Sequence, residues 1–147
     1  MKKYAKIAVV ISIIALISVV SSCSVFSALG KIFVDVQSGG ATTPSSFTVK
    51  AYLYEVNEDG DTVKEIESQK AVDIEPNSSH SIAFENEIRV GTRVKVFLGL
   101  KSKATSSAQS RYFYAEKTFV VVEGANELGN DDLVFHEETN ADNIWWY

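Results

Sequence analysis

Apolar and polar residues alternate through most of the chain after residue 30, which is the period-two pattern of β-strands. Because alternate side chains of a strand point to opposite faces of a sheet, each run predicts one buried face. Four runs are predicted to form the core: Ile32, Val34 and Val36; Phe47, Val49, Ala51 and Leu53; Ile82, Phe84, Ile88 and Val90; and Val94, Val96, Leu98 and Leu100. β-Branched and aromatic side chains, which favour strands, are frequent in them.

Four further segments are predicted to be strands. Residues 112–122 are apolar on both faces in their second half, which predicts a central strand covered on both sides. Residues 133–136 and 144–147 supply two shorter candidates. Residues 62–71 follow Asp61, which could cap a helix, but they sustain no apolar helical stripe, so we expect a strand there as well.

Turn-forming clusters separate these segments, at residues 38–44, 57–61, 76–79, 102–110 and 124–132. Seven or eight short strands with such turns predict an all-β fold, an antiparallel two-sheet β-sandwich over residues 31–147. Strand number and rhythm resemble the immunoglobulin-like and fibronectin type III-like sandwiches. The Cys-Trp-Cys motif of antibody domains is absent, because the only tryptophans are Trp145 and Trp146. The resemblance therefore implies a fold and no function.

The start of the chain has the order of an export signal. Lys2, Lys3 and Lys6 precede an apolar, uncharged run over residues 7–20. A membrane-spanning helix needs roughly 20 apolar residues, and this run is shorter. We therefore expect a signal peptide that is removed from the mature protein.

The end of this leader resembles the lipobox of bacterial lipoproteins, because Val20, Ser21 and Ser22 lead directly into Cys23, the sole cysteine. The resemblance implies that residues 1–22 are cleaved off, that the Cys23 thiol is joined to a diacylglycerol and that its amino group is acylated. Residues 23–30 would then be the lipidated cysteine and a short tether.

Two alternatives to lipidation remain open: a secretory signal cut a few residues later, after Ala28, and an uncleaved anchor. Ser24, rather than aspartate, follows Cys23. In bacteria with two membranes and the usual sorting rule, the resemblance then implies the outer membrane rather than the inner one.

The net charge of the chain without its leader limits the possible partners. Loss of the leader removes three of the fourteen basic residues and leaves eleven against nineteen acidic ones. An acidic surface is repelled by anionic lipid headgroups and by nucleic acid. We therefore expect membrane attachment through acyl chains on Cys23, of which two or more hold firmly, and no nucleic-acid partner.

Catalytic residues are scarce. Only His80 and His136 could act as imidazole bases, and His80 lies in a serine-rich turn where a neighbouring hydroxyl more often points away. His136 is followed by Glu137 and Glu138, but the zinc pattern with two histidines on one helical face is missing. Glu65 and Glu67 alternate with Ile66 and indicate a solvated strand face rather than a glycosidase pair. We expect no enzyme and no cofactor.

One segment could hold a metal ion. Asn57, Asp59 and Asp61 place oxygen ligands at alternate positions, as the start of an EF-hand loop does. The position of the bidentate glutamate holds Ser68, and Thr62 takes the place of the invariant glycine. A hairpin turn in which Gly60 adopts a positive φ explains the same residues, so we favour no metal site there.

Aromatic side chains are the remaining candidates for a binding surface. Read as a last strand, residues 143–147 place Trp145 and Tyr147 on one face and Ile144 and Trp146 on the other. One face is expected to close the core, and Trp145 and Tyr147 are then free to bind a partner. Tyr52 and Tyr54, together with Tyr112 and Tyr114, could extend that surface.

Three functions remain in order of expectation. The first is a membrane-anchored, non-enzymatic binding module of the cell envelope with a protein or glycan ligand. The second is a structural or assembly component that pairs strands with another chain through an open sheet edge. The third is a small hydrolase that uses His80 or His136.

Overall fold

The structure is a computed structural model that describes residues 27–107 and 109–140, and in this part of the chain it contains ten strands and one 3₁₀ helix. Their bounds are β1 Leu29–Gln37, β2 Phe47–Val56, β3 Thr62–Ser68, β4 Val72–Ile74, β5 Ser79–Ala83, β6 Ile88–Arg89, β7 Arg93–Ser102, β8 Tyr112–Val120, β9 Gly124–Leu128, η1 Asn130–Asp132 and β10 His136–Glu138.

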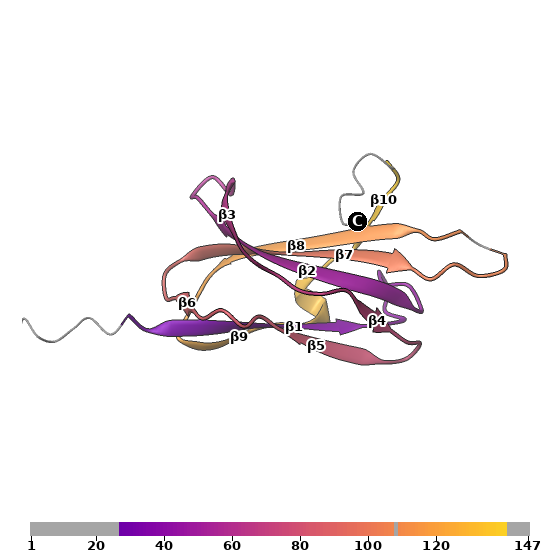
Figure 1. The fold of residues 1–147 in the computed structure, drawn as a ribbon, viewed down its shortest axis with the longest axis horizontal. Helices are drawn as coiled ribbons and strands as arrows, with labels where there is room; N and C mark the ends of the chain where they lie inside the picture. Colours follow the sequence, from indigo (N-terminus) through magenta and orange to yellow (C-terminus); the bar gives the residue numbers. More distant parts are fainter. Residues whose placement is uncertain (1–26, 108, 141–147) are drawn as a thin grey trace, which may run out of the picture.

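The strands form two sheets that pack as a β-sandwich, seen as two layers in Figure 1. The six-stranded sheet has the order β10-β8-β7-β2-β3, and β4 also pairs with β2. In the four-stranded sheet, β5, β6 and β9 all pair with β1. Both β5 and β6 are antiparallel to β1 and lie one after the other along it. The all-β, two-sheet prediction is confirmed.

The predicted core rows lie between the sheets. Members from β1, β2 and β7 are fully buried: Ile32, Val34, Val36, Phe47, Val49, Ala51, Leu53, Val94, Val96, Leu98 and Leu100. Ile82, Phe84 and Ile88 join the same cluster from the four-stranded sheet and its β5–β6 turn. Val90 does not join it, because β6 ends at Arg89 and the chain turns at Gly91, where φ is +88°. Its side chain is 37% exposed.

The pairing differs from the prediction in two ways. The described residues contain ten strands rather than seven or eight, because three short strands, β4, β6 and β10, add only two or three residues each. The sheets are also not wholly antiparallel, since β1 pairs in parallel with β9, from Gly30 opposite Gly124 to Val34 opposite Leu128. This pairing joins segments far apart in the sequence, so local alternation could not predict it.

The strand covered on both sides is β7 rather than β8. Residues 97–100 of β7 are all buried. The second half of β8 alternates between half-buried and exposed residues, and Val120 and Val122 are largely exposed. Residues 133–136 do not form the predicted strand, because only His136 belongs to β10; Leu133 and Phe135 nevertheless pack into the core. The strand predicted at residues 62–71 is confirmed as β3, which ends at Ser68, so residues 69–71 lie outside it.

The first strand begins at Leu29, two residues before the predicted start of the domain, so Leu29 and Gly30 belong to the sheet rather than to a tether. The predicted leader, Cys23 and the predicted strand at residues 144–147 lie outside the described residues. Within the described residues, no helix has the length and apolar character needed to cross a bilayer.

Glu67 on β3 links the two sheets at one edge. Its carboxylate accepts hydrogen bonds from the backbone N–H of Glu85, at 2.8 Å, and of Asn86, at 2.9 Å, which follow β5. The side-chain amides of Asn86 and Gln69 also donate to it. Partial burial acts to raise the pKa of Glu67, but these four donors outweigh it and lower the pKa below its ordinary value.

Glu67→Gln should destabilise the domain by about 1 kcal/mol at neutral pH, because the charged acceptor of several hydrogen bonds is lost. Since the folded-state pKa lies below the unfolded one, this stabilisation is present above the unfolded pKa and is lost as the pH falls through the folded one. Urea unfolding of the variant and of the unchanged protein at pH 7 and pH 3 measures the difference in their unfolding free energies. An equal difference in unfolding free energy at both pH values would contradict this role.

Candidate functional site

An aromatic row crosses the outer face of the six-stranded sheet. It consists of Tyr52, Tyr54, Phe97, Tyr114 and His136, which we call the aromatic face. Neighbouring ring centroids are 6.1 Å apart for Tyr52 and Tyr54, 6.2 Å for Tyr52 and Phe97, 6.3 Å for Phe97 and Tyr114, and 5.7 Å for Tyr114 and His136. These separations are within the range of attractive aromatic pairs, so the rings form one continuous surface.

Strand register explains why these residues meet. On β2 the core row takes every second residue, so Tyr52 and Tyr54 point away from the core. Phe97 lies opposite Tyr52, and Gly99 lies opposite Tyr114. His136 on β10 is the cross-strand partner of Tyr114. Four strands therefore each contribute at least one ring to the aromatic face.

Phe97 is the most buried ring of the aromatic face. Its side chain is 9% exposed, yet it does not belong to the hydrophobic cluster between the sheets. The rings of Tyr52 and Tyr114 flank it, the second in a nearly parallel stack with an interplanar angle of 11°. Gly99, two residues along β7, is buried as well. This part of the outer face is therefore an apolar strip.

Lysines accompany the rings. The Nζ of Lys50 lies 5.0 Å from the centroid of Tyr52, and the Nζ of Lys101 lies 5.7 Å from that of Tyr112, both within cation–π range. Lys95 is the cross-strand partner of Tyr54, and its Nζ lies 4.0 Å from Oε2 of Glu116. These lysines place ammonium groups beside the rings of an otherwise acidic chain.

The hydroxyl of Tyr54 remains protonated at neutral pH. Burial raises the pKa of Tyr54 above its ordinary value, and the negative charge of Glu65 acts in the same direction. The phenol is therefore available as a hydrogen-bond donor as well as an apolar ring. The aromatic face thus offers flat rings, hydroxyl groups and ammonium groups together.

The sequence identified part of this site. Tyr52 and Tyr54, with Tyr112 and Tyr114, were expected on an outward surface, and the structure brings all four onto the same outer face of the sheet. Phe97 was missed. On β7 it alternates with the core residues Val96 and Leu98, so its side chain points to the outer face. Trp145 and Tyr147, the other predicted binding residues, lie outside the described residues.

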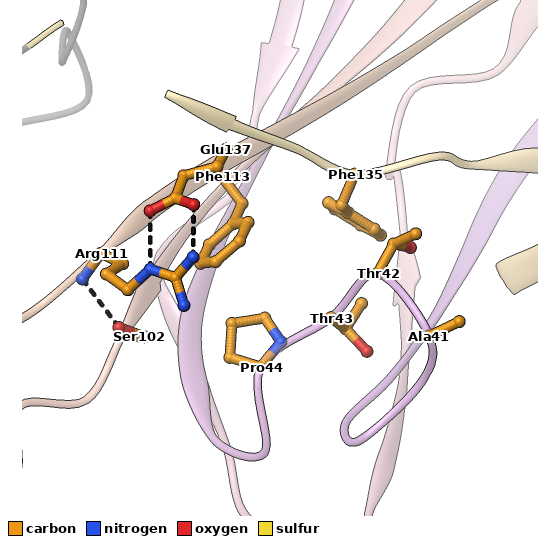
Figure 2. Close-up of a pocket in the computed structure, with 9 residues that line it drawn as sticks. All are labelled: Ala41, Thr42, Thr43, Pro44, Ser102, Arg111, Phe113, Phe135 and Glu137. Atoms are coloured by element: carbon orange, nitrogen blue, oxygen red, sulfur yellow. Dashed lines mark hydrogen bonds and ion pairs between the residues drawn. The ribbon is translucent and has the colours of Figure 1, made fainter. Parts of the chain in front are cut away.

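A pocket of about 450 Å³ lies at one end of the sandwich, where the loop between β1 and β2 forms one of its walls (Figure 2). Rings of Pro44, Phe113 and Phe135 form its apolar walls, and Arg111 and Glu137 form a polar one. The guanidinium of Arg111 also lies over the ring of Phe113, with 5.3 Å from Cζ to the centroid. Ala41, Thr42, Thr43 and Ser102 complete the lining.

The polar groups of this pocket bind one another. The Nε of Arg111 donates to Glu137 at 2.6 Å, and a second guanidinium nitrogen donates to the other carboxylate oxygen. The hydrogen bond to Glu137 raises the pKa of Arg111, and the same bond lowers the pKa of Glu137. Ser102 Oγ accepts the backbone N–H of Arg111, and Thr43 Oγ1 donates to the carbonyl of Gln37. A ligand would have to compete with these contacts, so the aromatic face is the stronger candidate.

The segment around Asn57 is a turn. Gly60 has a φ of +88°, as the hairpin prediction requires, and Asn57 and Asp61 hydrogen-bond to each other through backbone and side chain. Asn57 Oδ1 accepts the backbone N–H of Asp61 at 2.8 Å, so one of the predicted ligand atoms is already engaged. No cluster of metal-ligating side chains is found in residues 27–107 and 109–140.

The two histidines lie in different sheets. His80 is on β5 opposite Val36, and His136 is on β10 opposite Tyr114. The structure therefore does not bring them together, and His136 contributes its ring to the aromatic face instead.

No protein-family model matches this chain, and no curated protein or solved structure matches it. Its function is accordingly argued from its own residues.

Proposed function

We propose that this chain is an exported lipoprotein, anchored by acyl chains on Cys23, that binds a glycan strand of the cell envelope through the aromatic face. The protein acts by binding and catalyses no reaction. The observation that carries the proposal is the unbroken row of rings from Tyr54 to His136 across four strands. The anchor rests on the order of the leader and on Cys23 directly after it.

The aromatic face suits a sugar polymer for three reasons. Ring faces carry partial negative charge and attract the positively polarised C–H groups on the flat side of a sugar ring. Lysine ammonium groups and tyrosine hydroxyls beside the rings can donate hydrogen bonds to sugar hydroxyls and carboxylates. Finally, the rings follow one another across the sheet, so that several sugars of one strand can be contacted together.

Strand pairing is a weaker explanation for this molecule. The edge strand β3 carries Lys64, Glu65 and Glu67 and has two register shifts against β2. The opposite edge strand, β10, has only three residues. Charged side chains, irregular register and short length are features with which proteins prevent edge-to-edge association.

Binding can be tested by sedimentation with purified, insoluble peptidoglycan, an envelope glycan that carries carboxylates. We expect the protein to pellet with it saturably, and soluble fragments of the same glycan to release it. Chitin and cellulose, which carry no carboxylates, should retain less protein if the lysines contribute. Protein that stays in the supernatant at all glycan concentrations would overturn the proposed ligand class.

Cys23→Ala should release the protein from the membrane fraction. One acyl chain holds only marginally, whereas two or more hold firmly, and the substitution removes the group that carries them. The acidic domain provides no electrostatic replacement, because anionic lipids repel it. Fatty-acid labelling and membrane fractionation of both proteins measure the effect. Label and membrane attachment that both survive the substitution would show that Cys23 is not the anchor.

A further inference from the structure

The described residues include six large apolar side chains that are exposed, and four of them lie at one end of the sandwich. The chain enters β1 at this end, and the turn between β6 and β7 and the passage from β8 to β9 lie there as well (Figure 1). Exposed apolar side chains that are grouped, rather than scattered singly, are typical of a surface that meets a partner. We call these four residues the end patch: Leu29, Val90, Val120 and Val122.

Backbone hydrogen bonds hold the three segments of the end patch side by side. The N–H of Val90 donates to the carbonyl of Ala28, directly before β1, at 2.9 Å. The N–H of Gly91 donates to the carbonyl of Val121, between the two valines of the third segment, at 2.9 Å. The end patch is therefore one surface, although its segments are far apart in the sequence.

Two exposed arginines border the end patch, because Arg89 and Arg93 are the cross-strand partners of two of its members. Apolar side chains beside cations are typical of surfaces that bind a bilayer, where the apolar groups reach the acyl boundary and the cations meet anionic headgroups. Glu87 and Glu123 are close in sequence and offset part of this charge. Apolar contact is therefore the main attraction that the end patch offers.

We propose that the end patch rests on the lipid bilayer to which the chain is anchored. This inference rests on the proposed attachment through Cys23. Leu29 is the sixth residue after Cys23, so even a fully extended chain separates the two by at most about 20 Å. An anchor at this distance keeps the end patch at a high effective concentration beside the bilayer, so that weak contacts are sufficient.

Docking by this end leaves both other candidate surfaces accessible. The aromatic face lies on the outer side of the six-stranded sheet and includes no member of the end patch. The pocket lies at the other ends of the strands, since it is lined by the loop after β1, the last residue of β7 and the residue before β8. A glycan on the aromatic face and a bilayer at the end patch can therefore be bound together.

Cysteine reactivity tests the docking, with Val122 in the end patch and Val134 beside the pocket as two positions that are each 57% exposed. We would place a cysteine at one or the other in the full chain and add the purified lipidated protein to preformed vesicles of phosphatidylethanolamine and phosphatidylglycerol. The probe is a water-soluble maleimide that does not cross bilayers. Val122→Cys should react at least several-fold more slowly than Val134→Cys, because the bilayer excludes the reagent from the end patch.

Two controls separate the bilayer from other causes of slow reaction. In protein that also carries Cys23→Ala and is kept in solution, both cysteines should react at similar rates, since the domain exposes them equally. Leu29→Ser together with Val90→Ser should bring the rate of Val122→Cys on vesicles toward that of Val134→Cys. Circular dichroism shows whether each variant is folded.

The outcomes distinguish the end patch from the anchor. Equal rates on vesicles, with fatty-acid label present on Cys23, would overturn the docking and leave the anchor intact. Protein without label that does not bind the vesicles would contradict the anchor and, with it, the docking. Slow reaction of Val122→Cys in solution would show that protein covers the end patch. Slowing that disappears at low protein density on the vesicles would indicate a second copy, and either of these results would also overturn the docking.

Discussion

Replacing Tyr52 and Tyr114 together by alanine should weaken glycan binding by about a hundredfold or more. Truncation of a single aromatic anchor in a binding surface commonly costs about 2 kcal/mol, and two such losses are partly additive when the rings do not touch. Tyr52 and Tyr114 both lie against Phe97 but on opposite sides of it, the first ring tilted at 55° and the second nearly parallel at 11°. The variant therefore interrupts the row of rings on both sides of its centre.

The measurement is a titration of the protein against soluble peptidoglycan fragments. Val134→Ser is the matched control, because this side chain is apolar and 57% exposed but is not part of the aromatic face. It should bind as the unchanged protein does. A double variant that remains folded and binds with unchanged affinity would exclude the aromatic face as the binding site.

Gly30→Ala should destabilise the domain by about 3 kcal/mol or prevent its folding, the upper part of the range for overpacked interiors. A Cβ atom at Gly30 would lie 2.3 Å from the carbonyl oxygen of Val122 and 2.4 Å from a methyl group of Val121. Asn126 Nδ2 would be 2.7 Å away, and that side chain is held by hydrogen bonds to Val122 and Gly124. The neighbours are backbone or fixed side chains, so relief requires β1 and β9 to separate.

Chemical unfolding monitored by circular dichroism measures this effect. Gly129→Ala is the control, since the nearest atom to its added Cβ is 4.0 Å away and its φ is −90°, which any residue adopts. It should change the unfolding free energy by less than about 0.5 kcal/mol, as most surface substitutions do. If Gly30→Ala were as mild as this control, the close approach of β1 to the residues before β9 would be incorrect.

The sequence predicted the core because one face of each strand is buried, which enforces alternation over whole strands. This held for Phe47 to Leu53 on β2 and for Val94 to Leu100 on β7. It failed for Val90, because alternation continued by chance beyond the end of β6 into a turn. It also failed for the second half of β8, where Val120 and Val122 are apolar but exposed near the passage between the two sheets.

The candidate site was only partly predictable for a different reason. Alternation placed Tyr52 and Tyr114 on outward faces, but it says nothing about which strand lies between them. That strand is β7, and its register sets Phe97 between the two tyrosines. The parallel pairing of β1 with β9 could not be predicted for the same reason, because it depends on long-range contacts that leave no periodic signal in the sequence.

The central claim is that the aromatic face contacts the ligand, and backbone amide chemical shifts recorded during a titration with soluble peptidoglycan fragments test it most directly. The account predicts that the largest shifts occur at Tyr52, Phe97 and Tyr114 and their neighbours on β2, β7 and β8. Shifts concentrated instead at Thr43, Arg111 and Glu137 would place the ligand in the pocket at the end of the sandwich and contradict the claim.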